Sequence, residues 1–434
     1  MVVKKIDFSL SVQRRQQLIS LIQKKYPDIK KAKVLLFANF ERDGLPFRQD
    51  ASFYYFTGLE EPAAALCIDV QQTTSTLFVP NFGKEREKWV AEVIQPTQEH
   101  AKRLQLDVVE YLGNPCVGYQ CHPFFSTREY AHLLELLKEW RDNGYTIFTL
   151  NPSNLSDYVE QRFVLQRIAS YVPGFNEMLL DISLLVAQMR RKKSKREIEY
   201  LYKAIEVTVD SYESALSMLE IGKKECEIQA AIEYTFVVSG SVAAFTSIVA
   251  AGKNSTILHY IENEAVIRSG DLIVIDIGAR YNNYCADLTR TYPANGTFSP
   301  RQKEIYTLVL ETQTYIATLA KPGMWLSNKN YPDKSLNHLA KKYLEEHNYG
   351  HYFVHGIGHF LGLEVHDVGD YAQPLEEGDV ITIEPGIYIP EESIGVRIED
   401  DYWIVPDGAI CLSEQLPKEP HDIEKAVIEA RRKK

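Results

Sequence analysis

The sequence is poor in cysteine and has no long apolar run. Its 434 residues include six cysteines, and the nearest pair, Cys116 and Cys121, lacks the close spacing of a structural zinc site. We therefore expect reduced thiols that act mostly as packing residues, not a disulfide framework. No stretch of about twenty apolar residues occurs, and the segment from Met1 to Gln17 is too polar for a signal peptide. These absences predict a cytoplasmic protein without a membrane-spanning helix.

The sequence also lacks a large basic patch. Its formal net charge is −11, and basic residues cluster only in two short runs, Met189 to Arg196 and Arg431 to Lys434. A phosphate backbone or an anionic membrane needs a basic surface, so we expect neither a nucleic-acid nor a membrane partner. The composition, 45% hydrophobic and 25% charged, is that of a globular protein, and the length predicts two or three domains.

The first 175 residues alternate between helical and strand-like patterns, which indicates an α/β domain. The aromatic segment 47–62 is either packed core that ends in a turn, or part of a substrate mouth or subunit contact. The Pro-Gly pair at residues 173–174 marks a break, so the predicted domains are 1–175 and 176–434. We predict helices over residues 11–25, 84–94 and 127–143, and strands over residues 33–38, 63–69 and 76–79.

The second domain is predicted to contain the same order of elements twice, a pair of helices followed by a hairpin. Ser194 and Glu197 form a capping box that opens a long helix, and a second helix is predicted over residues 225–238. Ser299, with proline at the first helical position, opens a third helix, and a fourth covers residues 336–347. A hairpin follows each helix pair. We therefore predict an α/β (α+β) fold in which an α/β domain precedes a domain with an internal pseudo-repeat.

The first hairpin places two aspartates in an apolar setting. The runs LIVIDIGA and YCADLTRTY flank a polar turn near Tyr281, Asn282 and Asn283, and each run carries one aspartate, Asp276 or Asp287. An even-length loop puts both carboxylates on one sheet face, directly opposed or one diagonal apart. Like charges that close are unfavourable without a cation. Alternatively, one aspartate lies on a solvated face and the other caps the turn.

The second hairpin, residues 379–405, repeats this arrangement with two glutamates. A turn centred between Glu391 and Glu392 places Glu384 opposite Glu399, and each is flanked by isoleucine. Four unpaired carboxylates in one apolar site would cost more than the net stability of a domain unless they were protonated or bound to metal. The two hairpins therefore predict a site for two divalent metal ions.

Three histidines lie between the hairpins, within twelve residues of VHGIGHFLGLEVHDVG: His355, His359 and His366. The glycines disfavour a helix, so these are not the paired ligands of an H-E-x-x-H zinc helix. A lone histidine is more often a core or loop side chain than a ligand, but three so close together indicate a site. Oxygen-rich ligation with one imidazole favours a harder cation such as manganese.

The series Asp276, Asp287, His359, Glu384 and Glu399, in the contexts IDIGARYNNYCADLTR, HGIGH, TIEPGIYI and GVRIEDD, resembles the dinuclear metallopeptidases with the pita-bread fold. The segment FRQDASFYYFTGLEEP is similar to the corresponding part of aminopeptidase P. This resemblance implies a pseudo-two-fold pita-bread catalytic domain behind the N-terminal domain. It also points to the proline-specific members and away from methionine aminopeptidase. The family's acidic residue of the N-terminal domain matches either Glu41 or Asp43.

The resemblance also implies a role for each site residue. The five residues of the series would bind two divalent ions, most simply Mn²⁺, with a bridging hydroxide as the nucleophile. Glu384 would also shuttle a proton to the leaving nitrogen of proline, and His366 and His259 would stabilise the oxyanion. His355 would line the proline pocket, and Arg397 and Tyr388 would fix the carboxylates. Tyr388 is alternatively a core tyrosine.

The activity implied is that of an Xaa-Pro aminopeptidase, which releases the residue before a penultimate proline. The nearest alternative is an Xaa-Pro dipeptidase (prolidase), which shares the ligands and the fold. A third hypothesis is a non-catalytic peptide- or protein-binding module. Methionine aminopeptidase activity and creatine hydrolysis have less support from the sequence. The resemblance further implies a homodimer or homotetramer.

Overall fold

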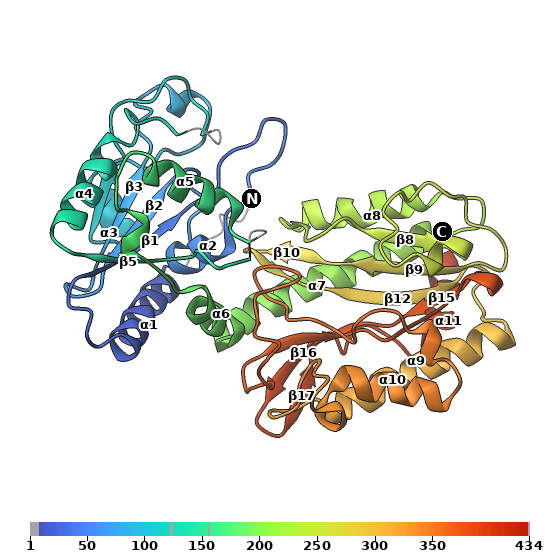
Figure 1. The fold of residues 1–434 in the computed structure, drawn as a ribbon. Coiled ribbons are helices and arrows are strands. Elements are labelled where there is room, and N and C mark those ends of the chain that lie inside the picture. Colours follow the sequence, from blue (N-terminus) through green and yellow to red (C-terminus); the bar gives the residue numbers. More distant parts are fainter. Residues whose placement is uncertain (1–7, 122–124, 155–156, 433–434) are drawn as a thin grey trace. The chain divides into compact units, whose positions relative to one another are not determined.

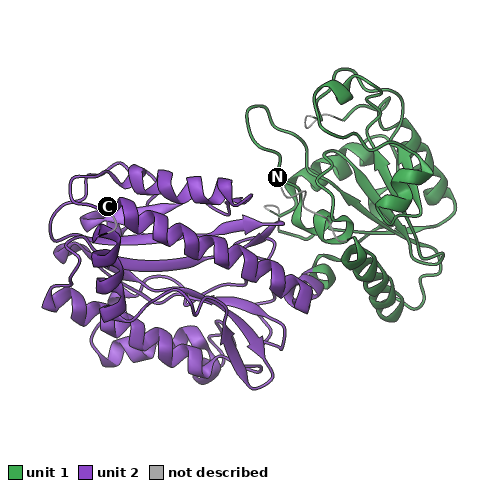
Figure 2. Ribbon diagram, turned by 180° about the vertical axis from the view of Figure 1, so that it is seen from behind, with its two compact units in different colours: residues 1–186 green, residues 187–434 purple. Residues whose placement is uncertain are grey.

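The computed structural model describes residues 8–121, 125–154 and 157–432. The chain forms two compact units, Met1–Val186 and Ala187–Lys434 (Figure 2). Strand β6 (Leu179–Asp181) pairs in parallel with β5 (Thr146–Thr149) of the first unit, so the first sheet extends beyond the predicted division at residues 175–176. Among the described residues, no helix combines the length and apolarity needed to cross a bilayer.

The first unit is built on a mixed sheet that confirms the predicted α/β domain (Figure 1). Its strands are β1 (Ala32–Phe37), β2 (Ala65–Asp69), β3 (Thr74–Val79), β4 (Val108–Tyr111), β5 and β6. Its helices are α1 (Ser9–Lys25), α2 (Ala51–Thr57), α3 (Gln98–Arg103), α4 (Ala131–Asp142) and α5 (Val159–Ala169). The strand order is β4-β3-β2-β1-β5-β6. The antiparallel pairs β1–β2 and β2–β3 lie inside the parallel pairs β3–β4, β1–β5 and β5–β6.

The predicted helix over residues 84–94 is wrong, because only a 3-10 turn forms there, at Arg86–Lys88. The side chain of Arg86 is buried and donates to both carboxylate oxygens of Glu41, so this contact organises the segment instead of an apolar helix face. The aromatic segment 47–62 contains α2, whose Phe53 and Phe56 are fully buried. It belongs to the packed core of the first unit.

The four predicted helices of the second domain form close to the predicted positions: α7 (Lys195–Met218), α8 (Glu225–Val238), α9 (Pro300–Leu319) and α10 (Leu336–Glu346). Two further helices lie outside the prediction: α6 (Ser183–Arg191), which spans the division at residues 186–187, and α11 (Pro420–Arg432). The predicted capping box is present at Ser194 with Glu197, and a second one forms at Ser299 with Gln302. Helix α7 packs against α8, and α9 packs against α10. Helices α8 and α10 lie at opposite edges of the unit in Figure 1.

Short antiparallel strands follow each helix pair, as the pseudo-repeat predicts. The first set is β7 (Val242–Ala243), β8 (Ile248–Ala251), β9 (Leu272–Ile277), β10 (Ala279–Tyr281), β11 (Tyr284–Cys285) and β12 (Leu288–Pro293). The second set is β13 (Val380–Ile383), β14 (Gly386–Ile389), β15 (Ile394–Arg397), β16 (Asp400–Val405) and β17 (Gly408–Cys411). The first hairpin turns at Asn282 and Asn283, whose φ angles are +48° and +65°. These values match a two-residue turn of the type that suits the strand twist.

The strand registers settle which residues face each other. Asp276 pairs with Thr289, so Asp287 lies one diagonal away from Asp276, which is one of the two predicted arrangements. In the second hairpin Ile383 pairs with Asp400 and Gly386 pairs with Arg397. Both pairs belong to one register, in which Glu384 and Glu399 hold opposite positions as predicted, although the two residues are not paired with each other.

Candidate active site

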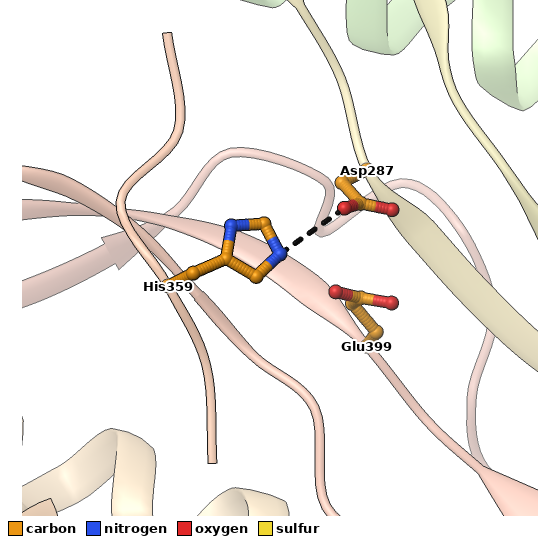
Figure 3. Close-up of side chains that lie close together, drawn as sticks. All are labelled: Asp287, His359 and Glu399. Carbon is orange, nitrogen blue, oxygen red and sulfur yellow. Dashed lines mark ion pairs between the residues drawn. The ribbon is translucent and has the colours of Figure 1, made fainter. Parts of the chain in front are cut away.

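Three side chains from separate segments converge in the second unit (Figure 3). Asp287 directly precedes β12, Glu399 directly precedes β16, and His359 lies on the loop before β13. Each offers one ligand atom, and these atoms all lie within 4.8 Å of one another. An antiparallel bridge between Thr289 and Glu399 ties β12 to the second hairpin. The group therefore forms only where the two halves of the unit meet.

The loop that carries His359 is held against β13. The backbone N–H of His359 donates to Thr382 Oγ1 at 3.1 Å, and the N–H of Thr382 donates to the His359 carbonyl at 2.9 Å. A Cβ atom on Gly358 would lie 2.0 Å from the Thr382 carbonyl oxygen, so only glycine permits this approach. His359 Nδ1 donates to the Phe360 carbonyl at 3.0 Å. This leaves Nε2 directed at Asp287, 3.3 Å away.

The other two predicted ligands border this group. Glu384 Oε1 lies 3.7 Å from His359 Nε2, and Thr382 Oγ1 lies 3.5 Å from the same carboxylate oxygen. Asp276 Oδ2 accepts from Arg397 at 2.5 Å. Its other oxygen, Oδ1, is buried without a hydrogen-bond partner among the described residues.

Burial dominates the electrostatics of the carboxylates. It raises the pKa of Asp287 to about 6 and the pKa of Glu384 to about 7, although His359 opposes both shifts. Burial and the neighbouring charge of Asp287 raise the pKa of Glu399 well above its usual range. Burial lowers the pKa of His359, but the hydrogen bond and charge of Asp287 outweigh it and raise that pKa to about 9. Negative charge is therefore crowded here and favours a cation.

A chain of hydrogen bonds runs from His355 to Asp276. His355 Nε2 lies 2.8 Å from the Tyr388 hydroxyl, which accepts from Arg397 at 2.9 Å, and Arg397 binds Asp276. His355 Nδ1 lies 2.8 Å from the Gly356 carbonyl. Burial lowers the pKa of His355 to about 4, so its ring is neutral, donates from Nδ1 and accepts at Nε2. Tyr388 is buried, but its hydroxyl joins two site residues instead of only filling the core.

His366 and His259 border the site in different ways. The His366 ring stands edge-on to His359, with centroids 4.3 Å apart. Burial, with the charges of His359 and His259, lowers the pKa of His366. His259 is exposed and follows the 3-10 turn Gly252–Thr256. Its charge also lowers the pKa of His355.

Sequence reasoning missed the residues that fasten the two hairpins together. Thr289 Oγ1 donates to Glu399 Oε2 at 2.7 Å, and Arg397 Nε donates to Thr289 Oγ1 at 3.2 Å. Arg290 is fully buried, donates to the Glu399 carbonyl at 2.7 Å and pairs with Asp400. The only signal in the sequence is that Thr289 and Arg290 follow Asp287 in an otherwise apolar strand.

The basic run at residues 189–196 also has a structural role that the sequence did not reveal. Arg190 and Lys193 are buried and pair with Asp367, at 2.5 Å and 3.2 Å. Asp367 follows His366, and its N–H donates to the Phe360 carbonyl. These ion pairs anchor the loop that carries both His359 and His366.

The donor set fits divalent metal ions. Carboxylate oxygens outnumber imidazole nitrogens, and Asp276 Oδ1 is a buried, unpaired oxygen among the described residues. Hard divalent cations bind such oxygen-rich sites. Asp276, Asp287, His359, Glu384 and Glu399 are therefore chemically suited to hold ions of this kind.

Comparisons with known proteins agree with this geometry. Metallopeptidase family M24 matches residues 199–406, and the aminopeptidase P N-terminal domain matches residues 12–114. The chain is similar to an Xaa-Pro aminopeptidase of Haemophilus influenzae, at 32% identity over 90% of this chain and 92% of that protein. It is also similar to an Xaa-Pro dipeptidase of Pyrococcus furiosus, at 34% identity over 83% of this chain and 90% of that protein.

A solved structure resembles the whole chain. The structure of aminopeptidase P from Escherichia coli with the inhibitor Pro-Leu superposes with a TM-score of 0.80 at 27% identity, and the match covers 99% of this chain and all of that one. The likeness thus includes both units. This chain belongs to metallopeptidase family M24, and it carries the aminopeptidase P N-terminal domain ahead of the family's catalytic domain.

Proposed function

We propose that the protein is an Xaa-Pro aminopeptidase that removes the N-terminal residue from peptides with proline in second position. The observation that carries the proposal is the likeness to an Xaa-Pro aminopeptidase over 90% of the chain. The cluster of Asp287, His359 and Glu399 supports it, because a peptidase of this family needs a site for metal. The substrates are therefore peptides that begin Xaa-Pro.

Asp276, Asp287, His359, Glu384 and Glu399 are the proposed ligands of two divalent ions, most simply Mn²⁺. The preponderance of oxygen donors with a single imidazole supports manganese over a thiolate-preferring metal. When bound, such ions polarise a carbonyl oxygen and lower the pKa of a water molecule.

Glu384 is the proposed proton carrier. Its side chain is 18% exposed, whereas that of Asp287 is 7% exposed, so an incoming substrate reaches Glu384 more easily. Its two oxygens lie 3.7 Å from His355 Nδ1 and from His359 Nε2. A proton held at this carboxylate can pass to the leaving nitrogen of proline.

The histidines and their partners are proposed to bind substrate. His366 and His259 would donate hydrogen bonds to the carbonyl oxygen as negative charge develops on it. His355, which packs edge-on to Phe353 with centroids 5.2 Å apart, would line the pocket for the proline ring. Arg397 and Tyr388 would keep Asp276 and His355 in place through the hydrogen bonds described above.

The chemistry of the peptide bond before proline explains why its cleavage needs a specialised active site. The bond before proline is a tertiary amide without an N–H, and the preceding residue is conformationally restricted. A peptidase that binds its substrate as an extended strand loses a hydrogen bond at this position. A pocket shaped for the pyrrolidine ring can instead select such peptides.

The test is Mn²⁺-dependent cleavage of Arg-Pro-Pro compared with Gly-Pro. We expect release of free arginine from the tripeptide, and loss of that activity in Glu384→Ala with the fold retained by circular dichroism. Turnover of Gly-Pro with none of Arg-Pro-Pro would instead identify a dipeptidase, which the 34% identity to the Pyrococcus furiosus Xaa-Pro dipeptidase keeps as the second candidate.

We also propose a cytoplasmic location and a homodimer or homotetramer. The six cysteines are all free, which suits a reducing compartment. The oligomer rests on the family resemblance alone. Multi-angle light scattering of the purified protein will give its mass, and a monomeric mass at micromolar concentration would refute the oligomer.

A further inference from the structure

A tyrosine of α7 reaches the backbone beside both aspartates. The hydroxyl of Tyr212 lies 2.9 Å from the Ile275 carbonyl and 2.8 Å from the Leu288 carbonyl. Ile275 immediately precedes Asp276, and Leu288 immediately follows Asp287. One side chain from the helix therefore joins the two strands of the first hairpin at the level of its carboxylate pair.

A glutamine of α9 makes the corresponding contact in the second half. Gln313 Nε2 donates to the Ile383 carbonyl at 3.1 Å and to the Ile398 carbonyl at 3.2 Å. These residues immediately precede Glu384 and Glu399. Each half thus places a buried polar side chain, from α7 or from α9, against two backbone carbonyls beside its carboxylate pair.

In the second half, strand pairing is interrupted at the glutamates. The N–H of Glu384 donates to the Ile357 carbonyl, and the N–H of Glu399 donates to the Thr289 carbonyl, so both turn away from their own hairpin. Strands β13 and β15 end at residues 383 and 397. Buried carbonyls beside such a gap need another donor, and the Gln313 amide supplies it.

Both side chains are buried at their contacts with the strand carbonyls. Tyr212 is 1% exposed and Gln313 is fully buried. Gln313 Oε1 accepts from Lys418 Nζ at 3.1 Å, and the same ammonium pairs with Asp400 at 2.9 Å. The ammonium group can only donate, so it fixes the amide with Nε2 towards the strand carbonyls.

We propose that Tyr212 and Gln313 are positioning residues, one in each half, that hold the hairpin backbones so that the four carboxylates converge on divalent cations. The inference rests on the proposed metallopeptidase function. Neither residue touches the proposed ligand side chains in the contacts described above, so each acts through the backbone beside them. Changes at these positions should weaken metal binding and lower kcat more than they change KM.

The test compares Tyr212→Phe and Gln313→Met with variants at the neighbouring positions. Ser211→Ala and Thr312→Val are matched controls, because both hydroxyls are fully buried but donate to carbonyls of their own helices, Val207 and Leu308. Mn²⁺ affinity is measured by calorimetry on chelator-stripped full-length protein. The melting temperature and the kcat and KM for Arg-Pro-Pro are measured in parallel.

We expect the two site variants to bind Mn²⁺ about 10- to 100-fold more weakly, with a matching loss in kcat, as for other groups that orient metal ligands. The controls should stay within about twofold of the wild type in both, even where their melting temperatures fall equally. Equal melting losses with unchanged Mn²⁺ affinity in all four variants would overturn the proposal.

Two further measurements keep the result unambiguous. If Gln313→Met does not fold, Gln313→Glu replaces it, because it keeps the side-chain length and the Lys418 partner but loses the donor, and the same loss of Mn²⁺ affinity is expected. The wild type is measured first. A wild type that neither binds Mn²⁺ nor cleaves Arg-Pro-Pro would refute the proposed function itself, whereas an active wild type with unaffected site variants would refute only the positioning role.

Discussion

At the scale of single residues, buried charge determines what the site can do. Carboxylates inside apolar strands stand out in a sequence, which is why Asp276, Asp287, Glu384 and Glu399 could be singled out from it. Thr289 and Gln313 could not be found in this way, because a buried threonine in a strand or glutamine in a helix has no distinctive pattern. Their roles depend on which backbone groups the fold leaves unpaired, and this is visible only in three dimensions.

Asp367 provides a residue-scale prediction about pH. Burial would raise its pKa, but the charges of Arg190 and Lys193 outweigh burial and lower it. The folded-state pKa thus lies below the unfolded value of about 3.9, so the carboxylate stabilises the fold above that pH and loses this effect as pH falls. Asp367→Asn should cost about 3 kcal/mol at pH 7. The deficit should shrink as pH falls below about 4.

Urea unfolding of wild type and variant between pH 7 and pH 3 measures this deficit. Glu364→Gln is the control, because Glu364 pairs with the same Arg190 but its side chain is 43% exposed. That change should cost less than about 1 kcal/mol. A deficit for Asp367→Asn that does not vary with pH would contradict the assignment.

The cysteines give a second residue-scale prediction. Cys226 is exposed, whereas Cys67 is buried and its pKa is raised by burial to about 12. At pH 8 the Cys67 thiol is therefore almost wholly protonated and unreactive. Iodoacetamide should modify Cys226 first in the native protein, as read by peptide mass spectrometry. Cys226→Ser should remove this fast phase, and equally rapid labelling of Cys67 would show that the first unit opens.

At the scale of elements, hydrogen-bonding patterns within a few residues predicted helix starts correctly. Elements that depend on distant contacts were missed or predicted wrongly. The capping boxes at Ser194 and Ser299 fixed two helix starts because their hydrogen bonds join residues three apart. The short strands β4, β5 and β6 escaped prediction because they are defined by partners far along the chain. The wrong prediction of a helix over residues 84–94 has the same cause, because the contact between Arg86 and Glu41 joins residues forty-five positions apart in the sequence.

The first hairpin turn supports an element-scale prediction. Asn283 has a φ of +65°, a conformation that costs residues with branched side chains about 1–2 kcal/mol. Asn283→Val should destabilise the protein by about that amount, whereas Asn283→Gly should be neutral or slightly stabilising. The two urea midpoints provide the measurement. Equal stability of both variants would show that the turn does not constrain the hairpin.

At the scale of the whole molecule, the candidate ligands all belong to one of the two compact units, Ala187–Lys434. A bound ion therefore stabilises that unit directly. Mn²⁺ at about 100 times its Kd adds about 2.7 kcal/mol to the stability of the form that binds it. In differential scanning calorimetry, EDTA should lower the transition of the second unit and leave that of the first unit in place.

Limited proteolysis during the same titration assigns each transition to its unit. EDTA should expose cleavage sites within residues 187–434 at lower temperature, while the fragment from residues 1–186 keeps its resistance. Equal displacement of both transitions would mean that the two units unfold as one cooperative body. No displacement at all would argue against the metal site.

The proposed ligands come from both halves of the catalytic unit. Asp276 and Asp287 come from its first hairpin, whereas His359, Glu384 and Glu399 come from its last third. A nascent chain leaving the ribosome consequently holds no complete ligand set until Glu399 has emerged and paired with β12. We therefore expect a chain that is truncated before Glu399 to lack peptidase activity.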